Sequence, residues 1–309
     1  MSKKTFISVG ECMAELQAAN DGLYRLGFAG DTLNTAWYMR ALTNTSNVSV
    51  EYLTSIGTDQ LSQKMLTFLK AGGIGTRFVD EIKDRTVGLY LITLTGAERN
   101  FTYWRSASAA RLLAEDERAL RSALGKADVI YFSGVTLAIL SPKHRKIFLG
   151  VLRDMKKRDV MIAFDTNTRR RLWPSDAAMK NAMIEAYKVS TLALPTFDDD
   201  RAVFGDDTPA ETIKRIAGYG VREIVVKDGE NPCFVLANEK LISVTPETVA
   251  GVVDTTGAGD SFNAGYIAAR LAEKSPESAA KFAHRVAGRV ICGRGALLDM
   301  AGFNDLALK

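Results

Sequence analysis

Short runs of β-branched and aromatic residues alternate with longer helical patterns in the second half of the sequence, and this alternation limits the fold more than any other feature. The segment 142–157 illustrates the helical pattern, because its apolar residues fall on one face and its charged residues on the other. Strands alternating with covering helices predict a doubly wound α/β fold with a mostly parallel sheet, which binds ligands beyond the carboxyl ends of its strands. The expected strands are Val129–Ser133, Val160–Asp165, Thr191–Pro195 and Arg222–Lys227.

Two segments do not follow this alternation of strands and helices. They have the alternating apolar and polar residues, and the turn residues, that are typical of β-hairpins. The first is Met13–Phe28, with Gly22 at its turn, and the second is Val87–Arg105, around the turn-like Thr95-Gly96-Ala97. Hairpins from distant parts of the chain can pair into a small projecting sheet, which would act as a lid over a cleft. We expect a single domain over residues 1–309, with a lid formed by about residues 12–30 and 86–106.

The composition favours an enzyme that works on small ligands in the cytoplasm. The chain is 47% hydrophobic and 25% charged over 309 residues, and it begins MSKKTFISVG, without the long apolar stretch of a secretory signal. Its longest apolar stretch, around 129–140, is too short to cross a bilayer, so we expect no membrane partner. A net charge of +4, spread along the chain, gives no reason to expect nucleic acid and suits small anionic ligands.

The cysteines and histidines predict neither disulfides nor a metal-binding site. The cysteines are Cys12, Cys233 and Cys292, an odd number without CxxC spacing, so buried reduced thiols are expected. The histidines, His144 and His284, are far apart in sequence and have no recognisable partner motif.

The segment 254–262, Asp-Thr-Thr-Gly-Ala-Gly-Asp-Ser-Phe, is the most informative in the chain. Small residues at 257–259 let backbone amides approach a ligand closely, and the helix that begins there adds partial positive charge, so the turn can hold a phosphate. Asp260 then lies in the first helical turn, where its carboxylate can take a proton from an attacking hydroxyl. The pattern indicates phosphoryl transfer.

A purely structural interpretation of this segment is that Asp260 only caps the helix and the glycines only form a turn. The other phosphate-binding motifs do not compete with it, since the chain has no GxxxxGK[ST] loop and no glycine at 262 to complete a dinucleotide fingerprint.

The segment resembles the C-terminal signature of the ribokinase-like (PfkB) carbohydrate kinases, Asp-Thr-x-Gly-Ala-Gly-Asp, which matches from Asp254 to Gly265. The resemblance implies a ribokinase-like fold, ATP as phosphoryl donor and Mg²⁺ as cofactor. It also implies that the amides of Gly257, Ala258 and Gly259 form an anion hole and that Asp260 is the catalytic base.

The resemblance covers essentially the whole chain and extends to the substrate. The segments 27–34 (Gly-Phe-Ala-Gly-Asp-Thr-Leu-Asn), 103–105 (Tyr-Trp-Arg) and 165–169 (Asp-Thr-Asn-Thr-Arg) are similar to the branch of the family that phosphorylates 2-keto-3-deoxygluconate at its C6 hydroxyl. Independently of the resemblance, Arg105 and Arg169 offer planar donor forks suited to a carboxylate, which a neutral sugar would not require.

The expected sugar-binding residues are Gly30, Asp31, Asn34, Tyr90, Tyr103, Arg105, Arg169 and Asp260. Each also has an ordinary structural interpretation. Asp31 can be a helix cap, the two tyrosines can simply pack across the hairpin, and an arginine after a tryptophan is often a surface or stacking residue.

The resemblance implies a nucleotide pocket formed by Asn167, Arg169, Lys227, Asp228, Gly229, Gly257 and Gly259. The sequence departs from the family at the Asn-x-x-Glu motif that organises magnesium through water, because Thr196 and Asp199 occupy those places. A shorter carboxylate at Asp199 can still orient water on Mg²⁺, although Asp198–Asp200 can also be the acidic first turn of a helix.

Two other functions stay open on the sequence alone: a kinase for fructose or 5-keto-2-deoxygluconate, and a non-catalytic sugar or nucleotide sensor, against which the intact 257–260 turn argues. A requirement for a monovalent cation is also left open. An exposed edge and apolar face on the lid predict a homo-oligomer formed through it.

Overall fold

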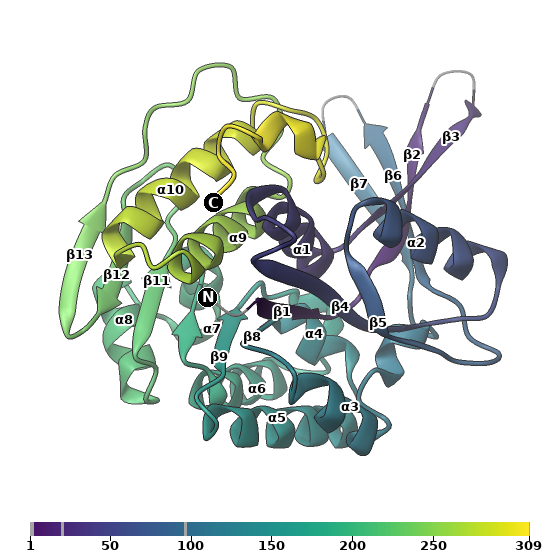
Figure 1. Cartoon of the computed structure of the whole chain (residues 1–309), viewed down its shortest axis with the longest axis horizontal. Helices are drawn as coiled ribbons and strands as arrows, with labels where there is room; N and C mark the ends of the chain where they lie inside the picture. Colours follow the sequence, from purple (N-terminus) through teal and green to yellow (C-terminus); the bar gives the residue numbers. More distant parts are fainter. Residues whose placement is uncertain (1–2, 20–21, 96–97, 309) are drawn as a thin grey trace.

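The computed structural model describes residues 3–19, 22–95 and 98–308. A nine-stranded sheet lies between two layers of helices, and a separate four-stranded sheet projects from one end of it (Figure 1). This confirms the predicted α/β fold with a large, mostly parallel sheet and a small additional one. Among the described residues, no helix has the length and apolar character needed to span a bilayer.

The large sheet has the strand order β13-β12-β11-β10-β9-β8-β1-β4-β5. All neighbouring pairs are parallel except those that β12 makes with β11 and β13. The nine strands are β1 (Lys4–Val9), β4 (Val48–Ile56), β5 (Gly75–Glu81), β8 (Val129–Ser133), β9 (Met161–Asp165), β10 (Leu192–Ala193), β11 (Glu223–Val226), β12 (Cys233–Ala237) and β13 (Lys240–Val244).

The four strands predicted from sequence are all present, with shorter boundaries in three cases. The prediction for β8 was correct at both ends, whereas β9 and β11 are trimmed by one residue at an end or at both. The third strand is only two residues long instead of the predicted Thr191–Pro195. Pro195 has no N–H to donate, so the regular strand ends before it, and an isolated bridge between Thr196 and Lys227 follows.

Side chains alternate between two hydrophobic cores, one on each face of the sheet. Along β8, for example, Tyr131 belongs to one core and Phe132 to the other. The first core is covered by α1 (Asp31–Leu42), α2 (Gln60–Ala71), α9 (Ala258–Leu271) and α10 (Pro276–Val290). The second is covered by α3 (Glu117–Leu124), α4 (Gly134–Ile139), α5 (Pro142–Lys156), α6 (Asp176–Val189), α7 (Phe197–Phe204) and α8 (Pro209–Gly218).

The two predicted hairpins pair into one four-stranded sheet with the order β3-β2-β6-β7. Its strands are β2 (Met13–Ala18), β3 (Tyr24–Ala29), β6 (Gly88–Thr95) and β7 (Glu98–Trp104), and the hairpins join through parallel pairing of β2 with β6. Gly22 has the positive φ of 73° expected at a turn, whereas the Gly96-Ala97 turn lies outside the described residues. The existence of the small sheet is confirmed; its role as a lid stays a prediction.

All three cysteines are free, and Cys12 and Cys233 are buried. The expectation of burial was wrong for Cys292, which is exposed and lies just after the C-cap of α10.

The order of the strands fixes where a ligand can bind. The chain runs outward from β1 in both directions, to β4 on one side and to β8 on the other, so the switch point lies between β1 and β8. In open α/β sheets the crevice outside the carboxyl ends at this point is the usual binding site. The residues after β1, β9 and β11 all lie at this edge, and the amino ends of α1 and α9 meet there.

Candidate active site

A left-handed glycine begins helix α9 at the carboxyl edge of the sheet. Gly257 is the N-cap with φ 80°, a conformation that side-chain-bearing residues rarely adopt. A Cβ at this position would also lie 2.8 Å from the carbonyl oxygen of Ala296. Both constraints require glycine, and the amino end of the helix that follows is where an anion is favoured. In the ligand-free turn the Ala258 amide donates to the Thr255 carbonyl at 3.2 Å.

The C-terminal segment braces this turn. The Asp254 carboxylate accepts a hydrogen bond from the Thr256 amide at 3.1 Å and from the Gly295 amide at 2.7 Å. The hydroxyl of Tyr38, on α1, donates to the Ala296 carbonyl at 2.7 Å. The turn therefore rests on a backbone segment that is itself tied to α1.

Asp260 lies in the first turn of α9, as predicted, and its carboxylate accepts a hydrogen bond from the Asn34 side chain at 2.7 Å. The pKa of Asp260 is raised to about 8, chiefly by burial and also by the neighbouring charges of Asp31 and Asp165, while Asn34 and Lys227 act in the opposite direction. A carboxylate whose pKa is this high is a strong enough base to accept a proton from an alcohol in a transition state.

Asp31 is the first residue of α1, and the N-cap is Gly30. The interpretation of Asp31 as the cap was therefore wrong, because its carboxylate accepts from the amide of the next residue, Thr32, and not from one further along the helix. Its other oxygen accepts from the Asn167 side chain at 2.6 Å. Asn167 follows β9 with φ 23°, so this contact ties the loop after β9 to the amino end of α1.

A buried ionic group lies beneath the turn. The Lys227 ammonium, after β11, donates to the Asn263 side chain at 2.9 Å and lies 3.4 Å from Asp165, the last residue of β9. Asn263 in turn donates to the other oxygen of Asp165 at 2.8 Å. A Cβ on Gly259 would lie 3.7 Å from the ammonium, so its positive charge is close to the amides that begin α9.

Asp199 faces the same edge from α7. Its carboxylate accepts from the hydroxyl of Thr168 at 3.0 Å, and burial, followed by the charge of Asp165, raises its pKa. Over residues 3–19, 22–95 and 98–308 no cluster of three or more acidic, histidine or cysteine side chains could hold a metal ion by itself. The donors nevertheless fit a hydrated Mg²⁺, because Asp165 Oδ1 is a buried acceptor without a hydrogen bond.

The remaining nucleotide-pocket predictions fall on more exposed positions. Arg169 is exposed, and its guanidinium donates to the carbonyl of Thr168 at 3.0 Å. Asp228 is half-buried, and Gly229, with φ 58°, is exposed at the turn that follows. These three residues therefore line the outer rim of the edge and lie outside the buried group around Lys227.

The sugar-binding residues predicted on the small sheet differ in burial and in hydrogen-bond partners. Tyr90 is buried and its hydroxyl donates to Glu15, whereas Tyr103 is half exposed across the same hairpin. Arg105 is largely buried and forms an ion pair with Glu11. The Arg105 Nε is buried without an acceptor, so the guanidinium keeps a donor for a further partner.

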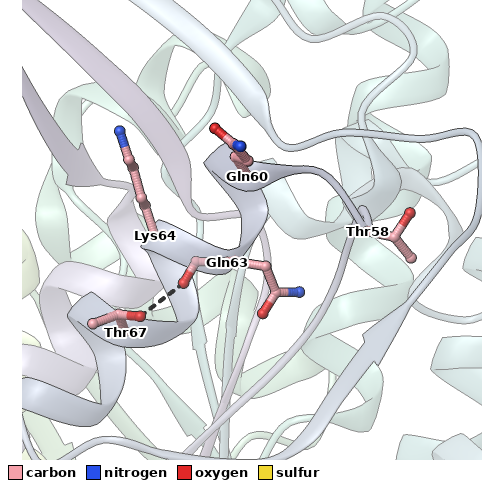
Figure 2. Close-up of a pocket in the computed structure, with 5 residues that line it drawn as sticks. All are labelled: Thr58, Gln60, Gln63, Lys64 and Thr67. Carbon is pink, nitrogen blue, oxygen red and sulfur yellow. Dashed lines mark hydrogen bonds between the residues drawn. The ribbon is translucent and has the colours of Figure 1, made fainter.

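Two surface cavities are present, and the second borders the segment that braces the Gly257 turn. One, of about 330 Å³, is lined by polar side chains of the α2 region, and Figure 2 shows the Thr67 hydroxyl within it bonded to the Gln63 carbonyl. The other, of about 320 Å³, lies between β2, β3 and the segment 294–299 and includes Glu15 and Ala296. Asp260 lines neither, so the candidate site is defined by its side-chain contacts and by the open edge of the sheet.

Sequence reasoning missed four polar residues that the fold brings to this site. Asp165 and Asn263 form the partners of Lys227, and Glu11 and Glu15 engage the small sheet. A signal for the two glutamates was available, since both are charged residues inside an otherwise apolar strand-like run, Ile7–Leu16. Asn263 is similarly the only polar side chain between Phe262 and Gly265 in the buried helix.

The family model described as pfkB family carbohydrate kinase matches residues 3–301. A match over nearly the whole chain, on a fold of this architecture, defines a kinase that acts on carbohydrates. The chain belongs to the pfkB family.

Two curated relatives with more than a third of their residues identical to this chain carry the same activity in their names. The chain is 37% identical to 2-dehydro-3-deoxygluconokinase of Haemophilus influenzae, over 99% of this chain and 98% of that protein. It is 39% identical to 2-dehydro-3-deoxygluconokinase of Escherichia coli K12, over 96% and 98%. Among solved structures, a protein named ribokinase II from Escherichia coli, in complex with ATP and Mg²⁺, superposes with a TM-score of 0.82 at 21% identity, covering 97% and 95% of the two chains.

Proposed function

We propose that this protein transfers the γ-phosphoryl group of ATP to the C6 hydroxyl of 2-keto-3-deoxygluconate, which is the compound also called 2-dehydro-3-deoxygluconate. The observation that carries the proposal is Asp260, a carboxylate with a raised pKa at the amino end of α9, beside the left-handed turn at Gly257. The names of the relatives at 37% and 39% identity support the choice of sugar.

In the proposed reaction Asp260 accepts the proton of the C6 hydroxyl as its oxygen attacks the γ-phosphorus. The amides of Gly257, Ala258 and Gly259 donate to the phosphoryl oxygens, and the Lys227 ammonium adds a fixed positive charge behind them. Mg²⁺, when bound to ATP, offsets charge on the phosphates. Asp165 and Asp199 would hold it through water, which suits a cation that usually keeps several of its waters.

The sugar would lie between the small sheet and Asp260, with the small sheet acting as its lid. Arg105 would hold the carboxylate through the donor that lacks a partner in the free protein. Tyr90, Tyr103 and Arg169 would contact the sugar from the rim, and Gly30, Asp31 and Asn34 from the amino end of α1. Asn34 would do so while it also orients the base.

The nucleotide would lie along the carboxyl edge of the large sheet. Asn167, Arg169, Lys227, Asp228 and Gly229 follow strands at this edge and are the proposed contacts, together with Gly257 and Gly259 at the phosphates.

The function is tested by comparing kcat/KM for 2-keto-3-deoxygluconate, gluconate, fructose, ribose and 5-keto-2-deoxygluconate in a coupled ADP-release assay with MgATP. We expect a strong preference for the keto-deoxy acid. A preference for a neutral sugar would keep the kinase and remove the carboxylate assignment of Arg105, whereas no turnover of any sugar would contradict the proposed function.

The pH dependence of the reaction should follow Asp260. Asp31, Asp165 and Lys227 are the charged groups that act on it, and the group must be ionised to accept a proton. Because its pKa is raised to about 8, kcat/KM should fall about tenfold per unit as the pH drops below 8, and should level off above it. Asp31→Asn removes a charge that raises this pKa, so the profile should move to lower pH. A midpoint that is the same in both proteins would contradict the assignment.

The small sheet also supports a homodimer. Of the nine large apolar side chains that the described residues expose, six belong to this sheet and its turn: Leu23, Tyr24, Leu26, Phe101, Tyr103 and Trp104. The strand register places Tyr24, Leu26 and Trp104 on one face of the sheet, and Phe101 and Tyr103 on the opposite face. The group on the first face is expected where another molecule covers the surface, and a second copy of the same sheet would do so. Light scattering on the eluting peak of a size-exclusion column should give twice the chain mass, and Leu26→Asp should reduce it to the chain mass. A wild-type monomer at assay concentration would contradict the proposal.

A further inference from the structure

The four chain crossings that connect the small sheet to the large domain meet at one residue, Glu11, whose carboxylate is buried. The crossings are the segments before β2, after β3, before β6 and after β7, since the other ends of these strands are hairpin turns. Glu11 itself lies on the first of them. A Cβ on Gly30, on the second, would lie 2.3 Å from the Glu11 carbonyl oxygen, and a Cβ on Gly88, where β6 begins, would lie 2.8 Å from Oε1.

Two hydrogen bonds from the fourth crossing complete this cluster. The Ser108 hydroxyl donates to Glu11 Oε1 at 2.5 Å, and the Arg105 guanidinium donates through Nη2 to Oε2. The Glu11 side chain is 0% exposed and that of Arg105 only 10%. The buried Glu11 carboxylate therefore fixes the position of the Arg105 guanidinium. It also decides which guanidinium donors already have an acceptor.

The Arg105 Nε is the donor that stays unused, because it is buried and has no acceptor. Leaving such a donor unsatisfied is costly in a folded protein, and an acceptor supplied by a ligand would remove the cost. A carboxylate is the acceptor whose geometry suits a guanidinium edge.

We propose that Glu11 is a positioning residue for substrate specificity: it holds Arg105 so that the Nε donor left without a partner recognises the carboxylate of the sugar, and it ties that recognition to the junction of the small sheet. This inference rests on the proposed function, in which the substrate is an acid sugar. Glu11 acts only through Arg105 and does not touch the substrate.

The test measures kcat/KM for 2-keto-3-deoxygluconate and for its methyl ester, which carries no charge. Glu11→Gln keeps the size of the side chain and an oxygen for Ser108, but its amide cannot accept from Arg105. We expect the variant to lose the preference for the acid over the ester by on the order of 10- to 100-fold, the worth of a charge-assisted hydrogen bond, through KM for the sugar. The KM for ATP should not change.

Ser108→Ala is the matched control, because it removes the other hydrogen bond to the same carboxylate and leaves Arg105 paired. It should keep the wild-type preference. The double variant Glu11→Gln/Arg105→Ala should be no worse than Arg105→Ala alone, since Glu11 acts through Arg105. An equal loss in Ser108→Ala, an equal loss for acid and ester, or a further loss in the double variant would each overturn the proposal.

If Glu11→Gln does not fold, Glu11→Asp is tested in its place. Aspartate keeps the buried charge, but its side chain is one methylene shorter, so the Arg105 guanidinium must move to stay paired with it. An unchanged preference for the acid in Glu11→Asp would overturn the proposal. The proposed function is judged separately, from the wild type alone. A wild-type enzyme that turns over a neutral sugar in preference to the acid overturns the function, and with it this inference, before any variant is made.

Discussion

Replacing Asp260 with asparagine should lower kcat by roughly 10²- to 10⁴-fold, the usual contribution of a general base. Binding should change little, because asparagine has the same shape and its oxygen can still accept the hydrogen bond from Asn34. The measurement is single-turnover ADP formation at saturating MgATP and sugar, together with calorimetric Kd values for each ligand. The drop in kcat with unchanged Kd is the signature of a group that acts only in the transition state.

The same substitution should not weaken the fold, and this separates a lost base from a damaged site. The pKa of Asp260 is raised from 3.8 to about 8 in the folded protein, so the fold favours the protonated carboxyl. That contribution to stability is fully present below the unfolded-state pKa and is lost as the pH rises toward 8. An asparagine does not ionise and escapes this loss, so the Asp260→Asn protein should melt at or above the wild-type temperature at pH 8, and the difference should shrink as the pH falls.

Asp31→Asn provides the comparison, since it alters a neighbouring carboxylate without removing the base. Its plateau kcat at high pH should stay within a few-fold of the wild type, whereas Asp260→Asn should have no pH at which activity returns. A near-normal kcat in Asp260→Asn would assign the base elsewhere, and loss of ligand binding would mean that the side chain positions substrate instead.

Features that depend on neighbouring residues could be predicted from the sequence. Three small residues, Gly257 to Gly259, followed by an aspartate predicted a turn and the place of Asp260 in the first turn of α9. This prediction was possible because the backbone conformation of such a turn depends on the residues within it. Alternating patterns likewise predicted both hairpins and the small sheet that they form.

Features that depend on contacts between distant segments could not be predicted. Nothing in the sequence indicates that Glu11 and Arg105 meet, or that the amide of Asn34 is used by Asp260, because each pair is far apart in the chain. The requirement for glycine at 257 also has a second cause that pattern analysis does not reach, the carbonyl of Ala296. Tertiary packing decides how these polar groups are satisfied, and a single sequence does not reveal it.

Replacing Lys227 with methionine should have the largest effect on stability, a loss of about 3–5 kcal/mol in the free energy of unfolding. Methionine matches the length of the side chain but removes the ammonium, and the Asp165 carboxylate, only 3% exposed, is then left buried with Asn263 as its remaining donor. Urea unfolding of the ligand-free protein measures the change. Lys214→Met, at an exposed position on α8, controls for the loss of one positive charge and should be neutral.

A second substitution distinguishes the structural cost from the catalytic one. In Lys227→Met/Asp165→Asn no buried charge lacks a partner, so most of the lost stability should return, since removing both members of a buried ion pair is often nearly neutral. Activity should not return, because the positive charge beside the amides of α9 is still absent. A double variant as unstable as Lys227→Met would mean that the lysine stabilises the fold by packing alone, and a double variant with wild-type kcat would remove Lys227 from the proposed phosphoryl-transfer site.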